Sequence, residues 1–253
     1  DRIGRKPIIL VGCLIAALAY IPVFKQISSL ANPALDKAID TVKVSVVADP
    51  AQCGSMFNPL GTRVFTSSCD LARQTLSESS VRYTIAPAAG AKSTIVRVNG
   101  ADLPFDAARP AETGAAIRAA LHAAGYPKAD DPGIVRMRGL FDIFRAQTAG
   151  LIGLLFVLVL FVTMVYGPLA AALVELFPTR IRYTSVSLPY HIGNGWFGGL
   201  LPAISFAMVA QTGDIYYGLW YPIVVAIMTA IIGMVFIPET KNRDIYIADT
   251  KRS

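Results

Sequence analysis

Residues 151–174, LIGLLFVLVLFVTMVYGPLAAALV, decide the fold class of this chain. The run contains no charged side chain and is dominated by leucine, valine, phenylalanine and alanine. A lipid hydrocarbon core of about 30 Å is crossed by about 20 residues of helix. The stretch therefore predicts a membrane-spanning helix.

The composition of the whole chain agrees with a membrane location. Hydrophobic residues make up 54% of the 253 positions and charged residues only 16%, which departs from the balance of a soluble globular domain. We expect an all-α set of four transmembrane spans, at about 7–24, 149–174, 185–210 and 218–237. The third of these is more polar than the others.

Positive residues next to the spans predict their orientation. They cluster before the first span, between the second and third, and after the fourth, at Arg2, Arg5, Lys6, Arg180, Arg182, Lys241 and Arg243. The connection 211–217 has no lysine or arginine, so the positive-inside rule places it outside and both termini in the cytoplasm. Lys25, Arg136, Arg138 and Arg145 lie on the other side and oppose this assignment. We expect a multi-pass protein of a bacterial cytoplasmic (inner) membrane.

Residues 26–146 differ in texture and predict a small α+β domain in the periplasm. The segments 42–47, 81–86 and 94–98 have the alternating, β-branched pattern of strands. Helices are expected at about 68–77 and 109–124, the second opened by a proline and closed by a glycine. The predicted domains are 1–25 (motif and first helix), 26–146 (insertion), 147–240 (three helices) and 241–253 (cytoplasmic tail).

Two of the three cysteines lie in this insertion. In an oxidising compartment, Cys53 and Cys69 are expected to form a disulfide, which would contribute about 3 kcal/mol in the chain-entropy model. Two buried free thiols are the alternative. Cys13 lies within the first span, where cysteine is usually a small packing residue.

Three polar strings recur at the predicted cytoplasmic ends of the spans. They are DRIGRK at 1–6, ELFPTRIR at 175–182 and PETKNR at 238–243. Charges at these positions stay out of the membrane, so they can pair with one another as a latch that breaks and re-forms. Independent solvated charges, each pair contributing about 0 to 1 kcal/mol, are the alternative.

Together these strings resemble the major facilitator superfamily, in which similar motifs precede the third and ninth helices and follow the tenth and twelfth. The stretch ELFPTRIRYTSVSLPYHIGNGWFGG is most similar to metabolite:proton symporters. The resemblance implies that this chain is the C-terminal part of a transporter, helices nine to twelve, with an N-terminal half as partner. It also implies a cytoplasmic gate formed by Asp1, Arg2, Arg5, Glu175, Arg180, Arg182 and Glu239. The large insertion departs from the family pattern.

The third span carries one polar, small-residue stripe on an otherwise apolar helix. Ser187, His191 and Asn194 recur at helical spacing and are candidates for lining a substrate cavity. Tight helix packing is the alternative, and Gly195 with Gly199 forms a G-x-x-x-G pair that suits it. Because imidazole titrates near physiological pH, His191 is a candidate proton-sensing group, although a lone histidine here is more often a hydrogen-bonded packing residue.

The second span contains a predicted hinge. Gly167 and Pro168 favour a bend, because proline removes a backbone donor and frees a carbonyl. Thr163 and Tyr166 precede the hinge and are further candidates for the substrate cavity. Tyr166 could hydrogen-bond a substrate carboxylate or, equally, satisfy a freed carbonyl.

No pattern of catalysis stands out. Two histidines without nearby cysteines do not predict a zinc site, and neither a nucleophile motif nor a phosphate-binding glycine loop occurs. We expect no enzyme activity, no cofactor and no bound metal, with the proton as coupling ion. The expected function is secondary transport of an organic acid or zwitterionic osmolyte by alternating access. A membrane-anchored periplasmic binding or docking module is the alternative.

Overall fold

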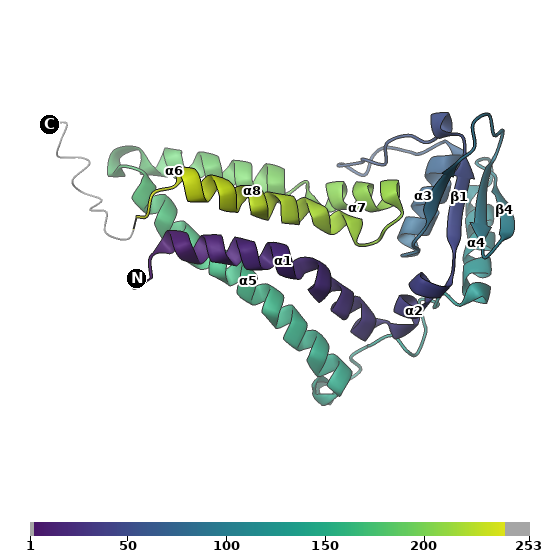
Figure 1. Cartoon of the computed structure of the whole chain (residues 1–253), viewed down its shortest axis with the longest axis horizontal. Coiled ribbons are helices and arrows are strands. Elements are labelled where there is room, and N and C mark those ends of the chain that lie inside the picture. The colour runs from purple at the N-terminus through teal and green to yellow at the C-terminus, as the bar shows by residue number, and fades with distance from the viewer. Residues whose placement is uncertain (1–2, 241–253) are drawn as a thin grey trace. The chain divides into compact units, whose positions relative to one another are not determined.

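The structure, a computed structural model, describes residues 3–240. Asp1, Arg2 and the predicted cytoplasmic tail lie outside the described residues. Within the described part, four helical segments are long and apolar enough to cross a membrane: Arg5–Ala31, Ala146–Leu176, Thr179–Thr212 and Tyr217–Phe236 (Figure 1). The four predicted spans are thus present, and the first extends further toward its C-terminal end than expected.

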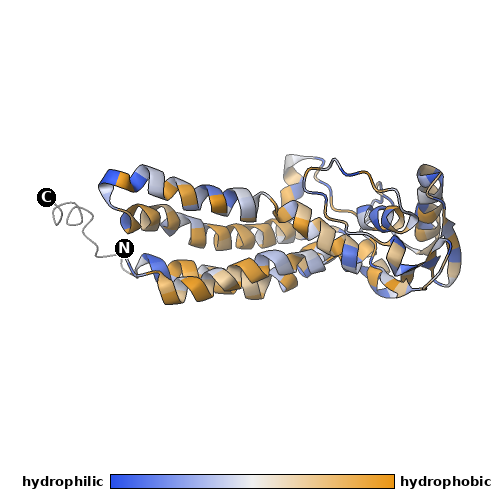
Figure 2. Cartoon of the chain, turned by 90° about the horizontal axis from the view of Figure 1, so that it is seen from above, coloured by the Kyte–Doolittle hydropathy of each residue, from blue (hydrophilic) through white to orange (hydrophobic). Residues whose placement is uncertain are grey.

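Two spans are single helices and two are composite. Helices α1 (Arg5–Ala31) and α5 (Ala146–Leu176) are continuous. The third span consists of α6 (Arg182–His191), a π-helical segment (Ile192–Gly198) and α7 (Leu201–Thr212). A short 3₁₀ turn and α8 (Trp220–Phe236) form the fourth. Apolar residues dominate α1, α5 and α8, whereas α6 is more polar (Figure 2).

The chain divides into two compact units. One contains residues 1–23, 152–201 and 220–253, and the other contains 24–151 and 202–219. In the first unit, glycines allow close helix contacts. A Cβ on Gly12 of α1 would lie 3.0 Å from the side chain of Val165 on α5. A Cβ on Gly233 of α8 would lie 2.8 Å from the side chain of Leu10 on α1.

The second unit contains a four-stranded mixed sheet in the order β2-β1-β3-β4. The strands are β1 (Val44–Ala48), β2 (Thr84–Pro87), β3 (Thr94–Val98) and β4 (Ala101–Phe105). Strands β1 and β2 are parallel, and the other two pairs are antiparallel. The sequence reasoning missed β4, although Asn99 and Gly100, with φ of 47° and 92°, form the two-residue turn that favours a hairpin.

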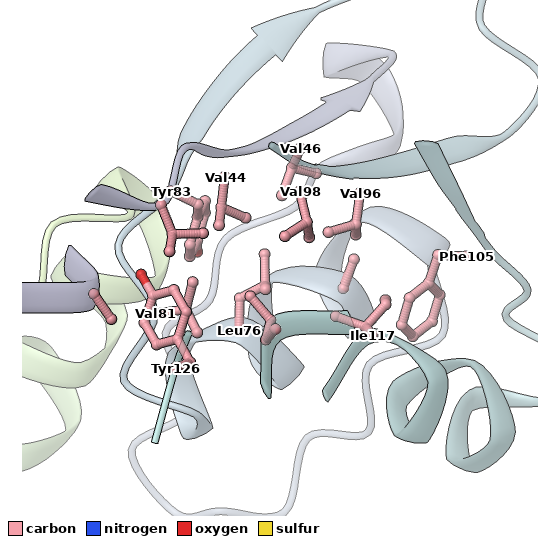
Figure 3. Close-up of a cluster of buried hydrophobic side chains, with 14 of the residues drawn as sticks. Val44, Val46, Leu76, Val81, Tyr83, Val96, Val98, Phe105, Ile117 and Tyr126 are labelled. Carbon is pink, nitrogen blue, oxygen red and sulfur yellow. The ribbon is translucent and has the colours of Figure 1, made fainter. Parts of the chain in front are cut away.

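Helices α3 (Ser68–Glu78) and α4 (Pro110–Ala124) cover one face of this sheet. Val46 and Val96 of the sheet and Leu76 of α3 have no solvent-exposed surface, and Ile117 of α4 is 1% exposed. Figure 3 shows these side chains gathered between the strands and the helices. A short helix, α2 (Pro33–Thr41), precedes β1 and was also missed. Burial of these apolar side chains stabilises the unit.

The end of α7 packs within this same unit. The Arg73 side chain, 2% exposed, donates from Nε to the carbonyl of Ala210 at 3.0 Å, and the Tyr83 hydroxyl donates to the same oxygen. The Tyr83 N–H donates to Gly213 at 3.0 Å. Ala210 lies in the last turn of α7, where carbonyls lack intrahelical donors. A positive side chain from α3 satisfies one of them and interacts favourably with the negative end of the helix dipole.

The loop before α3 is closed covalently and by a buried ion pair. Cys53 and Cys69 form a disulfide, with Cα atoms 5.2 Å apart. Asp70 lies 3.7 Å from the Arg73 guanidinium and accepts a hydrogen bond from the N–H of Gly54 at 2.9 Å. Because Asp70 is 5% exposed, its charge depends on these partners.

Candidate functional site

A charged cluster joins three of the helix ends in the first unit. The guanidinium of Arg5, at the start of α1, forms an ion pair with the carboxylate of Glu175, near the end of α5. The two side chains are 19% and 16% exposed, so the pair is largely shielded from solvent. It links the first and second of the three motif strings.

Glu239 adds the third string to this cluster. Its carboxylate accepts hydrogen bonds from the backbone N–H groups of Arg5 at 3.1 Å and Lys6 at 3.2 Å. These N–H groups lie in the first turn of α1, where no intrahelical acceptor exists. A carboxylate here satisfies the donors and interacts favourably with the positive end of the helix dipole.

Gly4 is required by this geometry. Its φ is +96°, and a Cβ would lie 2.6 Å from a carboxylate oxygen of Glu239. Glycine alone adopts such a backbone conformation without a steric penalty. The glycine of the DRIGRK string therefore allows Glu239 to reach the first turn of α1.

Lys6 also belongs to the cluster; it was expected to take part in a latch as one of the DRIGRK charges, but the family resemblance did not place it in the gate. Its ammonium group donates to the carbonyl of Met234 in the last turn of α8, at 2.8 Å. Lysine side chains commonly cap such carbonyls. The available signal was the basic string itself, placed at the same predicted membrane face as the end of α8.

The remaining predicted gate residues are placed differently. Arg182 donates from Nε to the carbonyl of Phe177 at 3.3 Å, and its Nη2 is buried without a hydrogen-bond partner among the described residues. Arg180 is exposed, and within residues 3–240 its side chain makes no hydrogen bond or ion pair. Asp1 and Arg2 lie outside the described residues. The structure thus brings together Arg5, Glu175 and Glu239.

A second polar feature joins the second and third spans. The hydroxyl of Tyr166 on α5 donates to the side-chain oxygen of Asn194 at 2.9 Å. Tyr166 is 49% exposed, and Asn194 is also exposed. Polar side chains facing lipid would be costly, so this pair requires another protein surface or a water-filled cavity beside it.

Asn194 lies in the π-helical segment. The N–H of Gly199 donates to the carbonyl of Asn194 at 2.8 Å, which is a five-residue step, and a Cβ on Gly199 would lie 2.3 Å from the carbonyl oxygen of Gly195. Gly199 thus serves the local backbone. A Cβ on Gly195 would meet no atom within 4 Å, so the described part of the chain packs nothing against that glycine. π-helical turns occur frequently at functional sites.

The other predicted cavity residues, and Ser205 further along the third span, form hydrogen bonds with nearby parts of the chain. His191 Nδ1 lies 2.7 Å from the Ser187 carbonyl oxygen and 3.2 Å from the Ser187 hydroxyl, one helical turn earlier. The Thr163 hydroxyl donates to Leu160 within α5 at 3.0 Å. Ser205 donates to the carbonyl of Gly218 at 3.0 Å, which favours packing for this residue.

Helix α5 runs without a break through Gly167 and Pro168. A Cβ on Gly167 would meet no atom within 4 Å. The hinge at these residues stays a prediction, because a continuous helix containing a proline can still bend there.

Comparison with known proteins matches a region that contains the Tyr166–Asn194 pair and, of the charged cluster, Glu175 and Glu239. A family model described as "Sugar (and other) transporter" matches residues 134–251. A putative metabolite transport protein of Haemophilus influenzae is 38% identical over 102 residues, covering 39% of this chain and 22% of the relative. Over this region the chain is thus similar to transporters of the major facilitator superfamily. Its match begins before α5 and includes the spans that carry Glu175, Tyr166, Asn194 and Glu239.

Two further relatives are named for the substrates that they transport. A citrate-proton symporter of Salmonella typhi is 44% identical over 54 residues, covering 21% of this chain and 12% of the relative. A glycine betaine/proline/ectoine/pipecolic acid transporter of Dickeya dadantii is 29% identical over 104 residues, covering 40% of this chain and 20% of the relative. The chain spans about a fifth of the length of its longer-matching relatives. No solved structure gives a significant match.

Proposed function

We propose that this chain forms the last four helices of a proton-coupled transporter that moves a small polar metabolite by alternating access. The observation that carries the proposal is the cluster of Arg5, Glu175 and Glu239. Three motif strings separated by up to 234 positions contribute to one set of charged contacts. If these charges were independent solvated surface groups, there would be no reason for the three strings to meet in one place.

The cluster acts as the cytoplasmic lock in this proposal. Arg5 ties the start of α1 to the end of α5, and Glu239 ties the chain after α8 to the first turn of α1. Opening toward the cytoplasm separates these ends and breaks the contacts. Their re-formation favours the outward-facing state, so the contacts bias a two-state equilibrium.

The Tyr166–Asn194 pair is the proposed substrate contact. Its hydroxyl and amide groups are exposed, face each other across two spans, and can exchange their mutual hydrogen bond for bonds to a substrate carboxylate. Ser187, His191 and Thr163 are proposed to line the same cavity. The citrate and betaine transporters among the relatives favour an organic acid or a zwitterionic osmolyte as substrate.

The sheet-containing unit is proposed to face the periplasm. An oxidising compartment favours the Cys53–Cys69 disulfide, and the positive-inside rule places the connection 211–217 on the same side. Both termini would then be cytoplasmic, in the inner membrane.

A second candidate function uses this unit as a binding module held by the membrane helices. A pocket of about 320 Å³ lies among α2, α3 and α4 and is lined by Arg118, His122 and Lys128, with Glu78 as a counter-charge. Anionic ligands would suit the three basic side chains. This candidate leaves the charged cluster without a role.

The test is uptake of radiolabelled citrate and glycine betaine by the full-length protein in proteoliposomes with an inward proton gradient. We expect uptake of one of the two compounds, its loss on adding an uncoupler, and at least a tenfold loss in Asn194→Ala. Thr229→Ala, which removes another side-chain hydrogen bond within a span, is the control. If neither compound is taken up along the gradient, but citrate binds to the protein and Arg118→Ala abolishes that binding, the result would favour the binding module.

A further inference from the structure

The segment that leads into α5 combines arginines with exposed apolar side chains. Residues 136–145 read RMRGLFDIFR and directly precede the first residue of α5, Ala146. Phe141 is 86% exposed, Phe144 82% and Met137 53%. Exposed apolar side chains, phenylalanine among them, that adjoin basic residues at a membrane surface can enter the boundary between headgroups and acyl chains. The position of this segment therefore indicates contact with a lipid surface.

A polar cavity lies beside these apolar side chains. It has a volume of about 350 Å³, and its lining includes Arg136, Arg138, Arg145 and Thr148. Asp130 and Asp131 also line it, so its side chains carry three positive and two negative charges. Asp131 is already engaged, because it accepts a hydrogen bond from the N–H of Gly133 at 2.7 Å.

The first turn of α5 adds backbone donors to the cavity. The bond from the Ala149 N–H to the Arg145 carbonyl, at 2.8 Å, is the first of the helix, so the preceding N–H groups lack intrahelical acceptors. Thr148 in this turn is only 5% exposed and lines the cavity. Within residues 3–240 its hydroxyl makes no hydrogen bond. The hydroxyl oxygen itself is not fully buried, so it is accessible to a ligand or water in the cavity.

The three arginines differ in their availability. Arg145 pairs with Asp142 at 2.9 Å, and Arg136 donates to the carbonyl of Ala129. The N–H groups of Arg138 and Gly139 donate to Asp142, which holds the pKa of that carboxyl below its usual range and keeps it charged. The guanidinium of Arg138 makes no hydrogen bond or ion pair with the described residues. Its positive charge also helps to lower the pKa of Asp142, but its N–H donors remain available to an external anion.

We propose that Arg136, Arg138, Thr148 and the first turn of α5 bind the phosphate headgroup of an anionic phospholipid. Guanidinium groups bind phosphate oxygens in a bidentate manner, and a helix N-terminus adds N–H donors and a favourable dipole. Phe141 and Phe144 would enter the acyl boundary beside that headgroup. The adjacent span and the exposed rings favour a lipid over free phosphate, which needs no apolar contact.

Native mass spectrometry of the full-length protein in detergent, titrated with phosphatidylglycerol, tests the proposal. We expect one phosphatidylglycerol to bind with a Kd about 30-fold weaker in Arg136→Gln/Arg138→Gln, about 5-fold for each arginine removed. Lys43→Gln/Lys92→Gln removes the same charge from two exposed side chains elsewhere in this unit and should leave that Kd unchanged. Phosphatidylcholine should not bind with this arginine dependence.

Two further measurements distinguish a lipid from a free anion. Phe141→Ser/Phe144→Ser should weaken phosphatidylglycerol binding, and inorganic phosphate at millimolar concentration should not displace the lipid. An unchanged Kd in the double arginine variant would overturn the proposal. Displacement by inorganic phosphate, with no effect of the phenylalanine variant, would assign the cavity to a free anion and overturn the lipid assignment.

Discussion

The two compact units satisfy their polar groups in different ways. In the unit that contains the sheet, Arg73 and Asp70 are buried and have partners within the unit, and a disulfide closes the preceding loop. In the unit of membrane helices, Tyr166, Asn194 and His191 are exposed. The sheet unit is therefore organised around its own core. The membrane unit instead presents polar side chains that require another protein surface or a water-filled cavity beside them.

The largest expected effect follows removal of Arg73. Arg73→Ala removes the charged partner of the buried Asp70 and one of the two donors to the Ala210 carbonyl, and we expect the sheet unit to lose about 3–5 kcal/mol of unfolding free energy. Pulse proteolysis in urea of the full-length protein in nanodiscs measures this loss. Arg97→Ala, which breaks the exposed pair with Asp102, is the matched control and should change little. Equal sensitivity of both variants would contradict the contrast.

Loss of the disulfide should have the next largest effect. Cys53→Ser/Cys69→Ser is expected to destabilise the sheet unit by about 3 kcal/mol, because the unfolded loop is no longer constrained. Thermal unfolding with and without a reductant measures it. The reductant should lower the Tm of the wild type and leave that of the double variant unchanged. A wild-type Tm that is insensitive to full reduction would show that the disulfide is not a stabilising link.

Substitution of Gly4 tests the membrane unit. Gly4→Ala places a Cβ against Glu239 at a positive φ, and we expect a cost of about 1–3 kcal/mol, concentrated at the charged cluster. The uptake rate should fall, and a cysteine that replaces the buried Thr240, next to Glu239, should become more reactive to a thiol reagent. Gly153→Ala, at a helix position with no atom within 4 Å, is the control. Normal uptake in Gly4→Ala would argue against a role for the turn.

The smallest effect on stability is expected at the exposed pair. Tyr166→Phe should change the unfolding free energy by less than about 0.5 kcal/mol yet raise the KM for the transported metabolite about tenfold. Tyr221→Phe also loses one hydroxyl bond, to the Phe197 carbonyl at 3.0 Å, and should leave KM unchanged. Similar KM values in the two variants would show that the Tyr166 hydroxyl does not contact the substrate.

Local patterns predicted much of the fold. The spans follow from charge-free apolar runs, strand β3 was predicted at 94–98, and α4 was predicted from its opening proline and closing glycine. The missed elements also had local signals. Asn32 caps α2 by accepting from the Leu35 N–H at 3.1 Å, with Pro33 as the first helical residue, and Asn99–Gly100 marks the β3–β4 hairpin.

The site was less predictable because its contacts join distant parts of the chain. The family resemblance grouped Arg5, Glu175 and Glu239, but composition and periodicity do not reveal that Glu239 caps the first turn of α1. The Tyr166–Asn194 bond joins two spans, and Asn194 lies in a π-helical turn that the sequence pattern did not predict. The local sequence around Arg73 does not indicate that its side chain is buried, because its partner, the Ala210 carbonyl of α7, lies 137 positions away.

A charge swap of Arg5 and Glu175 is the most direct test of the proposed cytoplasmic lock. Arg5→Glu and Glu175→Arg should each reduce gradient-driven uptake by the full-length protein at least tenfold, because each places like charges together in a poorly solvated position. The double variant restores an opposite pair and should regain a substantial part of the wild-type rate. Full uptake in either single variant, or a double variant no better than the singles, would contradict a cytoplasmic lock formed by this pair.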